Sequence, residues 1–173
     1  MNLLFVADGR SPIALNWMRF FAEGGHSVHL VSLYPCNPDI RLASLEILPI
    51  AFGQVDSGPS KDSGAGRNYS QLESLGSPRL RTLLRQVIVP LRLPQAARRL
   101  RKQVEKVHPE LVHAMRLPYE GMAAALANPA APLLISIWGN DFTLHASRTP
   151  LTGRYTRLAM ARSDALHTDC RRD

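Results

Sequence analysis

An apolar run that leads directly into a polar turn is the pattern in this sequence most suggestive of chemistry. Residues 133–138 are followed at once by Gly139, Asn140 and Asp141. Such a run is typical of a buried parallel strand, and open α/β sheets bind ligands just beyond the carboxyl ends of their strands. Asn and Asp would offer hydrogen bonds there, although an Asx-turn that caps a helix would use the same side chains structurally.

A second group of polar residues surrounds the end of another short apolar run, residues 110–115. His113 and Arg116 flank this end, and Tyr119 and Glu120 lie in the turn that follows. A single histidine at a strand end is often structural. The gathering of several polar groups at one strand end nevertheless favours a binding role.

The turn after the first apolar run, residues 2–7, contains Gly9 and Arg10 and leads to Ser11-Pro12, a typical helix start. The free N–H groups of such a start suit an anionic or hydroxyl-rich ligand. The GxGxxG and GxxxxGK[ST] patterns are absent, as are GxSxG and HExxH. We therefore expect no dinucleotide cofactor and no P-loop, and without an acidic metal-binding pair we expect no metal.

The elements that must position these residues alternate between strands and helices. This order predicts an α/β fold, a three-layer doubly wound and mainly parallel sheet flanked by helices, in a single domain over residues 1–173. Residues 54–78, rich in Ser and Gly, are expected to form a mobile loop. The predicted strands are 2–7, 26–33, 45–50, 110–115, 133–138 and 165–168; the predicted helices are 12–23, 80–88 (stopped by Pro90), 97–107, 119–127 and 150–162.

No apolar run reaches the roughly 18–20 residues that a membrane-spanning helix needs. The N-terminus lacks a basic leader and is read as a strand rather than a signal peptide. Cys36 and Cys170 lie far apart in the sequence and are interpreted as two reduced thiols of a cytoplasmic protein.

The net charge of +7 is concentrated in one segment, residues 79–106, which has nine Lys or Arg against a single acid. Association with an anionic membrane surface is the favoured interpretation, because each basic residue near such a surface contributes about 1 kcal/mol. A merely solvated face is the alternative. Nucleic-acid binding is disfavoured, since no aromatic residues are interleaved and no known motif is present. The candidate membrane-surface residues are Arg79, Arg81, Arg85, Arg98, Arg99, Arg101 and Lys102.

Taken in order, five segments resemble the N-terminal domain of family 4 glycosyltransferases, which are retaining enzymes built from two facing Rossmann-like domains (the GT-B fold). The resemblance covers nearly the whole sequence, and it is moderately specific in each segment and stronger in their order. The segments are residues 3–9, 22–28, 109–114, 136–142 and 161–169.

This resemblance implies a hexosyltransferase half that binds the acceptor hydroxyl, possibly lipid-linked. The nucleotide-sugar donor would bind mainly to a second domain that the sequence lacks, so the chain alone is expected to be inactive. Glycolipid, polysaccharide or cell-envelope synthesis is the expected setting, in the cytoplasm and possibly at the inner face of the membrane.

The same resemblance implies roles for individual residues. Gly9 matches the glycine turn near sugar and phosphates, and Gly139 and Asp141 match the Gly-x-Asp turn of the cleft. Trp138 stands where many members have histidine, although a tryptophan ring can stack on a sugar. His113 matches the first histidine of a His-x-His pattern whose second position is Met115. We therefore predict Asp141 and Trp138 as catalytic.

The remaining predicted residues would bind acceptor or sugar: Gly9, Arg10, His113, Arg116, Tyr119, Glu120, Gly139 and Asn140. Two other functions stay open on the sequence alone. The first is a non-enzymatic, peripheral membrane-binding module. The second is half of a sugar-nucleotide epimerase.

Overall fold

The computed structural model describes residues 1–50, 78–139, 141 and 149–168. For residues 78–87 it describes the backbone only. Most of the predicted mobile loop, residues 54–77, lies outside the described residues. Pro78, the last residue of that predicted loop, is instead the first residue of a helix.

All neighbouring strands in the central six-stranded sheet are parallel, in the order β3-β2-β1-β4-β5-β6. This confirms the predicted fold class. Strand β3 ends three residues before its predicted end, because Pro49 has no N–H to donate to the ladder. The strands are β1 (Asn2–Ala7), β2 (Ser27–Ser32), β3 (Ser44–Ile47), β4 (Leu111–Ala114), β5 (Leu133–Ile137) and β6 (Ala165–Thr168).

Helix α1 (Pro12–Glu23) follows β1 and covers one face of the sheet. Its start is as predicted, with the Ser11 hydroxyl accepting from the N–H of Ala14 at 3.4 Å. Its end is also as predicted, since Gly25 has a φ of +81°, a conformation that glycine adopts at little cost. Ala14 and Met18 are buried against Phe5 and Leu30. The apolar spacing of the sequence therefore identifies the face of α1 that packs on the sheet.

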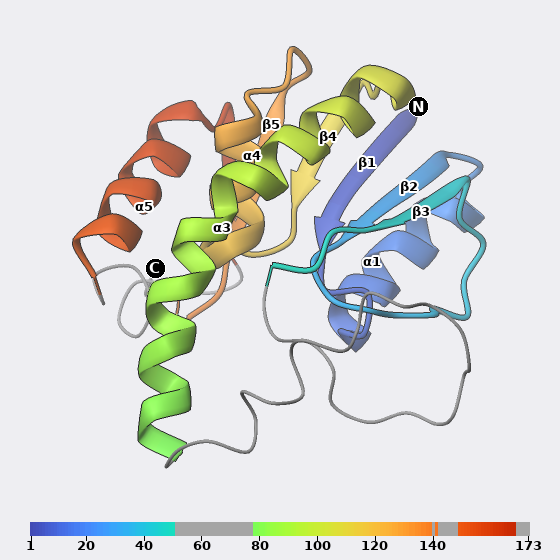
Figure 1. The fold of residues 1–173 in the computed structure, drawn as a ribbon. Helices are drawn as coiled ribbons and strands as arrows, with labels where there is room; N and C mark the ends of the chain where they lie inside the picture. Colours follow the sequence, from blue (N-terminus) through green and yellow to red (C-terminus); the bar gives the residue numbers. More distant parts are fainter. Residues whose placement is uncertain (51–77, 140, 142–148, 169–173) are drawn as a thin grey trace.

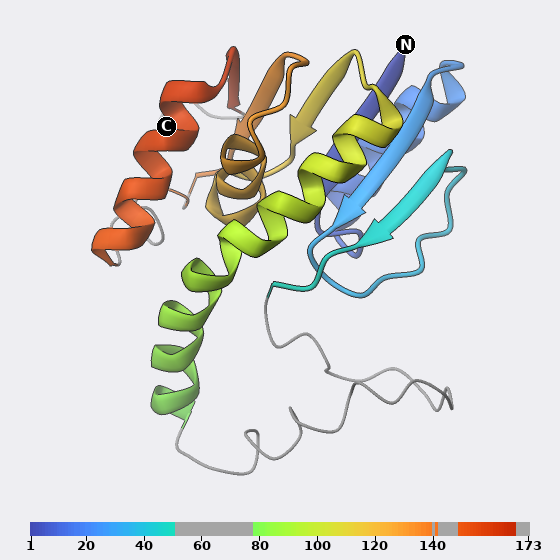
Figure 2. The same cartoon turned by 45° about the horizontal axis from the view of Figure 1, so that its top comes forward.

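Helix α3 (Pro78–Val107) corrects the prediction of two helices separated at Pro90. Both Pro90 and Pro94 lie inside it. Each proline removes one hydrogen bond, but packing of the apolar face, including buried Leu93 and Leu100, outweighs that loss. Figure 2 shows the helix changing direction along its length, as internal prolines cause.

The second face of the sheet is covered by α3, α4 (Met122–Ala127) and α5 (Pro150–Arg162), as Figure 1 shows. Helix α5 begins with the predicted Thr149 cap, here part of a reciprocal capping box with Thr152. Helix α4 starts three residues later than predicted, because a single π-turn, η1 (Leu117–Gly121), precedes it. No helix in the described part of the chain is long and apolar enough to span a bilayer.

Two arginines bind the carbonyl groups at the C-terminal end of α4. Arg101 on α3 donates from Nε to the carbonyl of Ala127, and Arg162 on α5 donates to the carbonyl of Ala125, both at 2.8 Å. Cations are favourable at this end of a helix, where carbonyl groups lack intrahelical partners. Arg101 therefore has a structural partner in addition to its predicted surface role.

Replacing Arg101 with glutamine should lower the free energy of unfolding by about 1–2 kcal/mol, the contribution of a charge-assisted hydrogen bond. Lys102→Gln, an adjacent exposed position with the same charge change, should stay within about 0.5 kcal/mol of wild type. Urea unfolding followed by circular dichroism measures both. Equal midpoints for the two variants would contradict the capping role.

Candidate functional site

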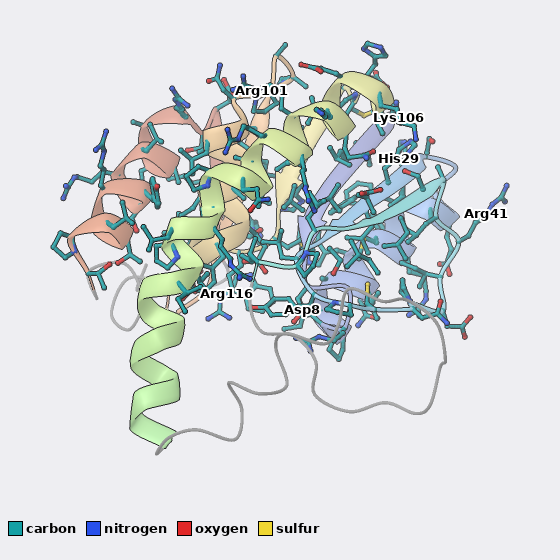
Figure 3. The ribbon with its side chains drawn as sticks, in the orientation of Figure 1. Asp8, His29, Arg41, Arg101, Lys106 and Arg116 are labelled. Carbon is teal, nitrogen blue, oxygen red and sulfur yellow. The ribbon has the colours of Figure 1, made fainter. Side chains whose placement is uncertain are left out.

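The candidate site lies at the carboxyl edge of the sheet, where the strand order reverses between β1 and β4. The chain leaves β1 toward α1 on one face and leaves β4 toward α4 on the other. Ligands of open α/β sheets bind at such a reversal. Figure 3 shows Asp8, after β1, and Arg116, after β4, near one another at this edge.

Gly9 and Arg10 occupy the turn after β1, and Asp8 holds this turn. The Asp8 carboxylate accepts two bonds from the Arg10 guanidinium, both at 2.9 Å. The Arg10 guanidinium lies 4.4 Å from the ring centre of Tyr34, the second residue after β2. The N–H of Gly9 donates to Ser32, and a side chain at position 9 would collide with the sulfur of Cys36. Close packing of the Cys36 and Leu30 side chains around this turn therefore favours glycine at position 9.

Asp141 joins the turn after β5 to the turn after β4. Its side chain is fully buried and accepts from Nε of Arg116 at 2.9 Å, the N–H of Trp138 at 3.1 Å and the N–H of Leu117 at 3.3 Å. Burial would lower the pKa of the Arg116 guanidinium, but Asp141 outweighs this effect and raises it. The structure therefore gives Asp141 a positioning role; its predicted catalytic role stays a prediction.

Arg116 combines a fixed position with access to solvent. Its side chain is 39% exposed. Its guanidinium lies 5.9 Å from the ring centre of the partly exposed Trp138, and the Tyr34 phenol acts on it electrostatically. The edge thus presents hydrogen-bond donors beside aromatic faces, an arrangement that suits a sugar.

Glu120 is directed inward by the π-turn, in which the N–H of Gly121 donates to the carbonyl of Arg116 at 2.8 Å. Tyr119 in this turn has a φ of +66°, a strained conformation for a tyrosine. Glu120 is only 5% exposed, and burial raises its pKa to about 8; Arg116 opposes the increase, while Asp8 and Asp141 add to it. At neutral pH the side chain is thus a protonated carboxylic acid, a group that can donate a hydrogen bond as well as accept one.

His113 lies elsewhere, in the layer between the sheet and α1. Its Nε2 is 2.9 Å from the Ser136 hydroxyl, which in turn is 3.3 Å from Nδ1 of His167. The Trp17 ring packs edge-on against both imidazoles. Burial, together with His167, lowers the pKa of His113 to about 4. The structure does not bring this neutral histidine to Arg116, and its predicted acceptor-binding role stays a prediction.

The other predicted site residues differ in how far the structure describes them. Gly139 is exposed in the turn after β5, and Tyr119 is half-buried. Asn140 lies outside the described residues. No group of three His, Cys, Asp or Glu side chains within the described ranges could hold a metal ion.

Sequence reasoning missed Asp8 and Tyr34 as site residues. Both come within two positions of a strand's carboxyl end, the signal that identified Arg116. Applying the same rule to β1 and β2 would have found them.

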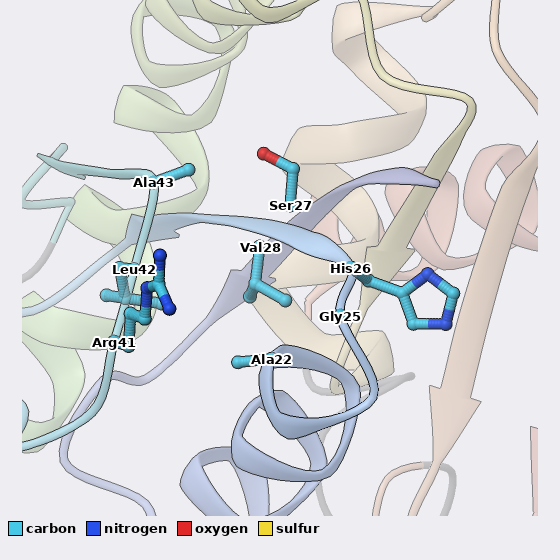
Figure 4. Close-up of a pocket in the computed structure, with 8 residues that line it drawn as sticks. All are labelled: Ala22, Gly25, His26, Ser27, Val28, Arg41, Leu42 and Ala43. Carbon is cyan, nitrogen blue, oxygen red and sulfur yellow. The ribbon is translucent and has the colours of Figure 1, made fainter.

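A separate hollow of about 410 Å³ lies at the opposite edge of the sheet, where α1 ends and β2 begins (Figure 4). It contains none of the predicted site residues, and strands present their amino ends there. We therefore place the candidate site at the carboxyl edge. The residues that line this hollow are Ala22, Gly25, His26, Ser27, Val28, Arg41, Leu42 and Ala43.

Comparison with known proteins adds a family. A family model described as a glycosyl transferase 4-like domain matches residues 9–173. The matched range begins at Gly9 and includes the turns after β2, β4 and β5. No curated protein matches the chain.

Glu120→Gln should stabilise the protein increasingly as the pH rises. The pKa of Glu120 is raised in the folded state, so the wild-type protein loses stability between pH 4.5 and about 8, because the carboxyl ionises in the unfolded chain but stays protonated in the folded one. The Glu120→Gln variant does not show this loss of stability, because its amide does not ionise. The difference in unfolding free energy should grow by about 1.4 kcal/mol per pH unit between pH 5 and 7. Urea unfolding across this range measures it.

Glu105→Gln is the matched control, because its carboxyl is exposed on α3. This variant should follow the wild-type pH dependence. A difference between Glu120→Gln and wild type that stays constant with pH would contradict the buried, protonated state of Glu120.

Proposed function

Because the chain belongs to the glycosyl transferase 4-like family, we propose that it is the N-terminal, acceptor-binding half of a retaining glycosyltransferase. The enzyme would move a hexose from a nucleotide-sugar donor to an acceptor hydroxyl, in glycolipid, polysaccharide or cell-envelope synthesis. A second domain would bind most of the donor. The family match carries the proposal, and the polar cluster at the carboxyl edge supports it.

The proposed mechanism rests on positioning and electrostatic stabilisation. Arg116 and Arg10 donate hydrogen bonds to acceptor hydroxyls, and the Trp138 ring stacks on the transferred sugar. Asp141 acts through Arg116, since its own oxygens already accept bonds within the protein. In the complete enzyme the developing oxocarbenium charge and the leaving diphosphate are stabilised between the two halves.

Purified 1–173 should transfer no sugar from any nucleotide sugar to a glycoside acceptor. The same residues joined to a donor-binding domain should do so, and Arg116→Ala should reduce the kcat/KM of that two-domain enzyme at least about tenfold, the effect of losing one positioned charged group. Chromatography of labelled products measures both. Turnover by 1–173 alone would contradict the proposal, and an epimerised nucleotide sugar formed without acceptor would favour the epimerase.

A second candidate function is association with an anionic membrane at the cytoplasmic side, favoured by the outer face of α3. Exposed basic side chains follow this face, whereas most described apolar side chains of α3 pack on the sheet, Leu91 being exposed. Arg101 contributes less, because its Nε is bonded to Ala127. The side chains of Arg79, Arg81 and Arg85 lie outside the described part. The exposed basic residues of the described face are Arg98, Arg99, Arg101, Lys102 and Lys106.

The double variant Arg98→Glu, Lys102→Glu should bind anionic vesicles at least about tenfold more weakly, because each basic residue contributes about 1 kcal/mol. Arg19→Glu, Arg41→Glu carries the same charge change at exposed positions outside α3 and should bind like wild type. Sedimentation with phosphatidylglycerol vesicles measures the difference. An equal loss of vesicle binding in both double variants would contradict a specific role for α3.

A further inference from the structure

We infer that the acceptor bound at the carboxyl edge is a neutral, polyhydroxylated sugar rather than a phosphorylated or carboxylated one. This inference rests on the proposed function and deepens it. It comes from the way the charged side chains that the structure describes at this edge are paired.

Both arginines of the site already hold a carboxylate of the same chain. Arg10 makes two bonds to Asp8, and Arg116 is bonded to Asp141. An anionic ligand at Arg116 would compete with Asp141, which is fully buried and also binds two backbone N–H groups. Asp141 cannot leave, because removing the cation from a buried ion pair leaves an uncompensated charge.

The same pairs suit hydroxyl groups. The side chains of Arg10 and Arg116 are 52% and 39% exposed, and Asp8 is 28% exposed. A guanidinium has five N–H donors, so each arginine keeps donors beyond those that its carboxylate uses. A hydroxyl can accept from the arginine and donate to the neighbouring carboxylate at once, whereas a phosphate dianion can only accept. The pair Arg10–Asp8 therefore complements a sugar hydroxyl better than an anion.

Aromatic rings lie beside both guanidiniums. Tyr34 is 4.4 Å from that of Arg10, and Trp138 is 5.9 Å from that of Arg116. An aromatic face complements the C–H face of a sugar ring, which has no counterpart in a phosphate group. Ion pairs that lie beside aromatic rings therefore favour a ligand that contains a sugar ring.

The protonated state of the buried Glu120 shows that this edge disfavours an added negative charge. Among the described residues, the charges that act on its carboxyl are those of Arg116, Asp8 and Asp141, one positive and two negative. Together with burial they keep the group protonated at neutral pH. His113 adds no cation, because burial keeps its imidazole neutral. An anionic acceptor would thus be repelled by the carboxylates of Asp8 and Asp141, while Arg10 and Arg116 are already paired with them.

The test compares each neutral sugar or cyclitol with its own phosphate on residues 1–173: glucose with glucose 6-phosphate, mannose with mannose 6-phosphate, and inositol with inositol 1-phosphate. Chemical-shift titration by NMR gives both dissociation constants of a pair. We expect at least one neutral sugar to bind about tenfold more tightly than its phosphate, since like-charge contact weakens the latter. Shifts should centre on Arg10, Arg116 and Tyr34.

Asp8→Asn tests the role of the ion pair, because it keeps the shape of the side chain and removes the negative charge that pairs with Arg10. This variant should bind the phosphates at least about fivefold more tightly than wild type does. Glu23→Gln, the same charge change at the exposed far end of α1, should leave both constants unchanged.

The outcomes separate the two proposals. Tighter binding of the phosphates by wild type, or no gain in Asp8→Asn, would overturn the inference and leave the glycosyltransferase half intact. No binding of either kind at this edge would overturn the inference together with the acceptor-binding role.

Discussion

One buried carboxylate determines the geometry of this edge of the protein. Asp141 has no solvent exposure and accepts hydrogen bonds from Arg116, Leu117 and Trp138. These partners belong to the turns after β4 and β5, so Asp141 links the two turns beyond the ends of their strands. Because a buried charge must be compensated, neither turn can move without a large cost. Hydrogen bonds between the strands form the sheet, and Asp141 fixes the position of the turns and side chains at its carboxyl edge.

The remaining features of the site follow from that constraint. Arg116 is held beside the Trp138 ring, and the π-turn that begins after it carries Glu120 inward and strains Tyr119. Burying a carboxyl near two others destabilises the fold, so stability alone does not explain why position 120 is a glutamate. After β1, on the other side of the point where the strand order reverses, Asp8 and Arg10 form a second ion pair beside Tyr34. The result is an edge rich in donors and acceptors but nearly balanced in charge.

Much of this could be predicted from the sequence, because local patterns determined it. Strand positions and the Ser11 and Thr149 helix starts followed from apolar periodicity and turn residues, and the family was indicated by the resemblance of five segments taken in order. Predictions were wrong where packing overrode local preference, as at Pro90 inside α3 and at the π-turn before α4. The pairing of Arg116 with Asp141 joins residues 25 positions apart, and no local pattern contains it. The burial of His113 beneath Trp17 likewise depends on a face of the sheet that the sequence alone did not assign.

Hydrogen exchange of the Arg116 Nε–H group, measured by NMR on the unmodified chain, tests the central claim most directly. A guanidinium bonded to a buried carboxylate should exchange at least about tenfold more slowly than that of the exposed Arg41, because exchange then requires local opening. It should also accelerate in Asp141→Asn. Exchange of Arg116 as fast as that of Arg41 would show that Asp141 does not hold it, and the account of this edge would fail.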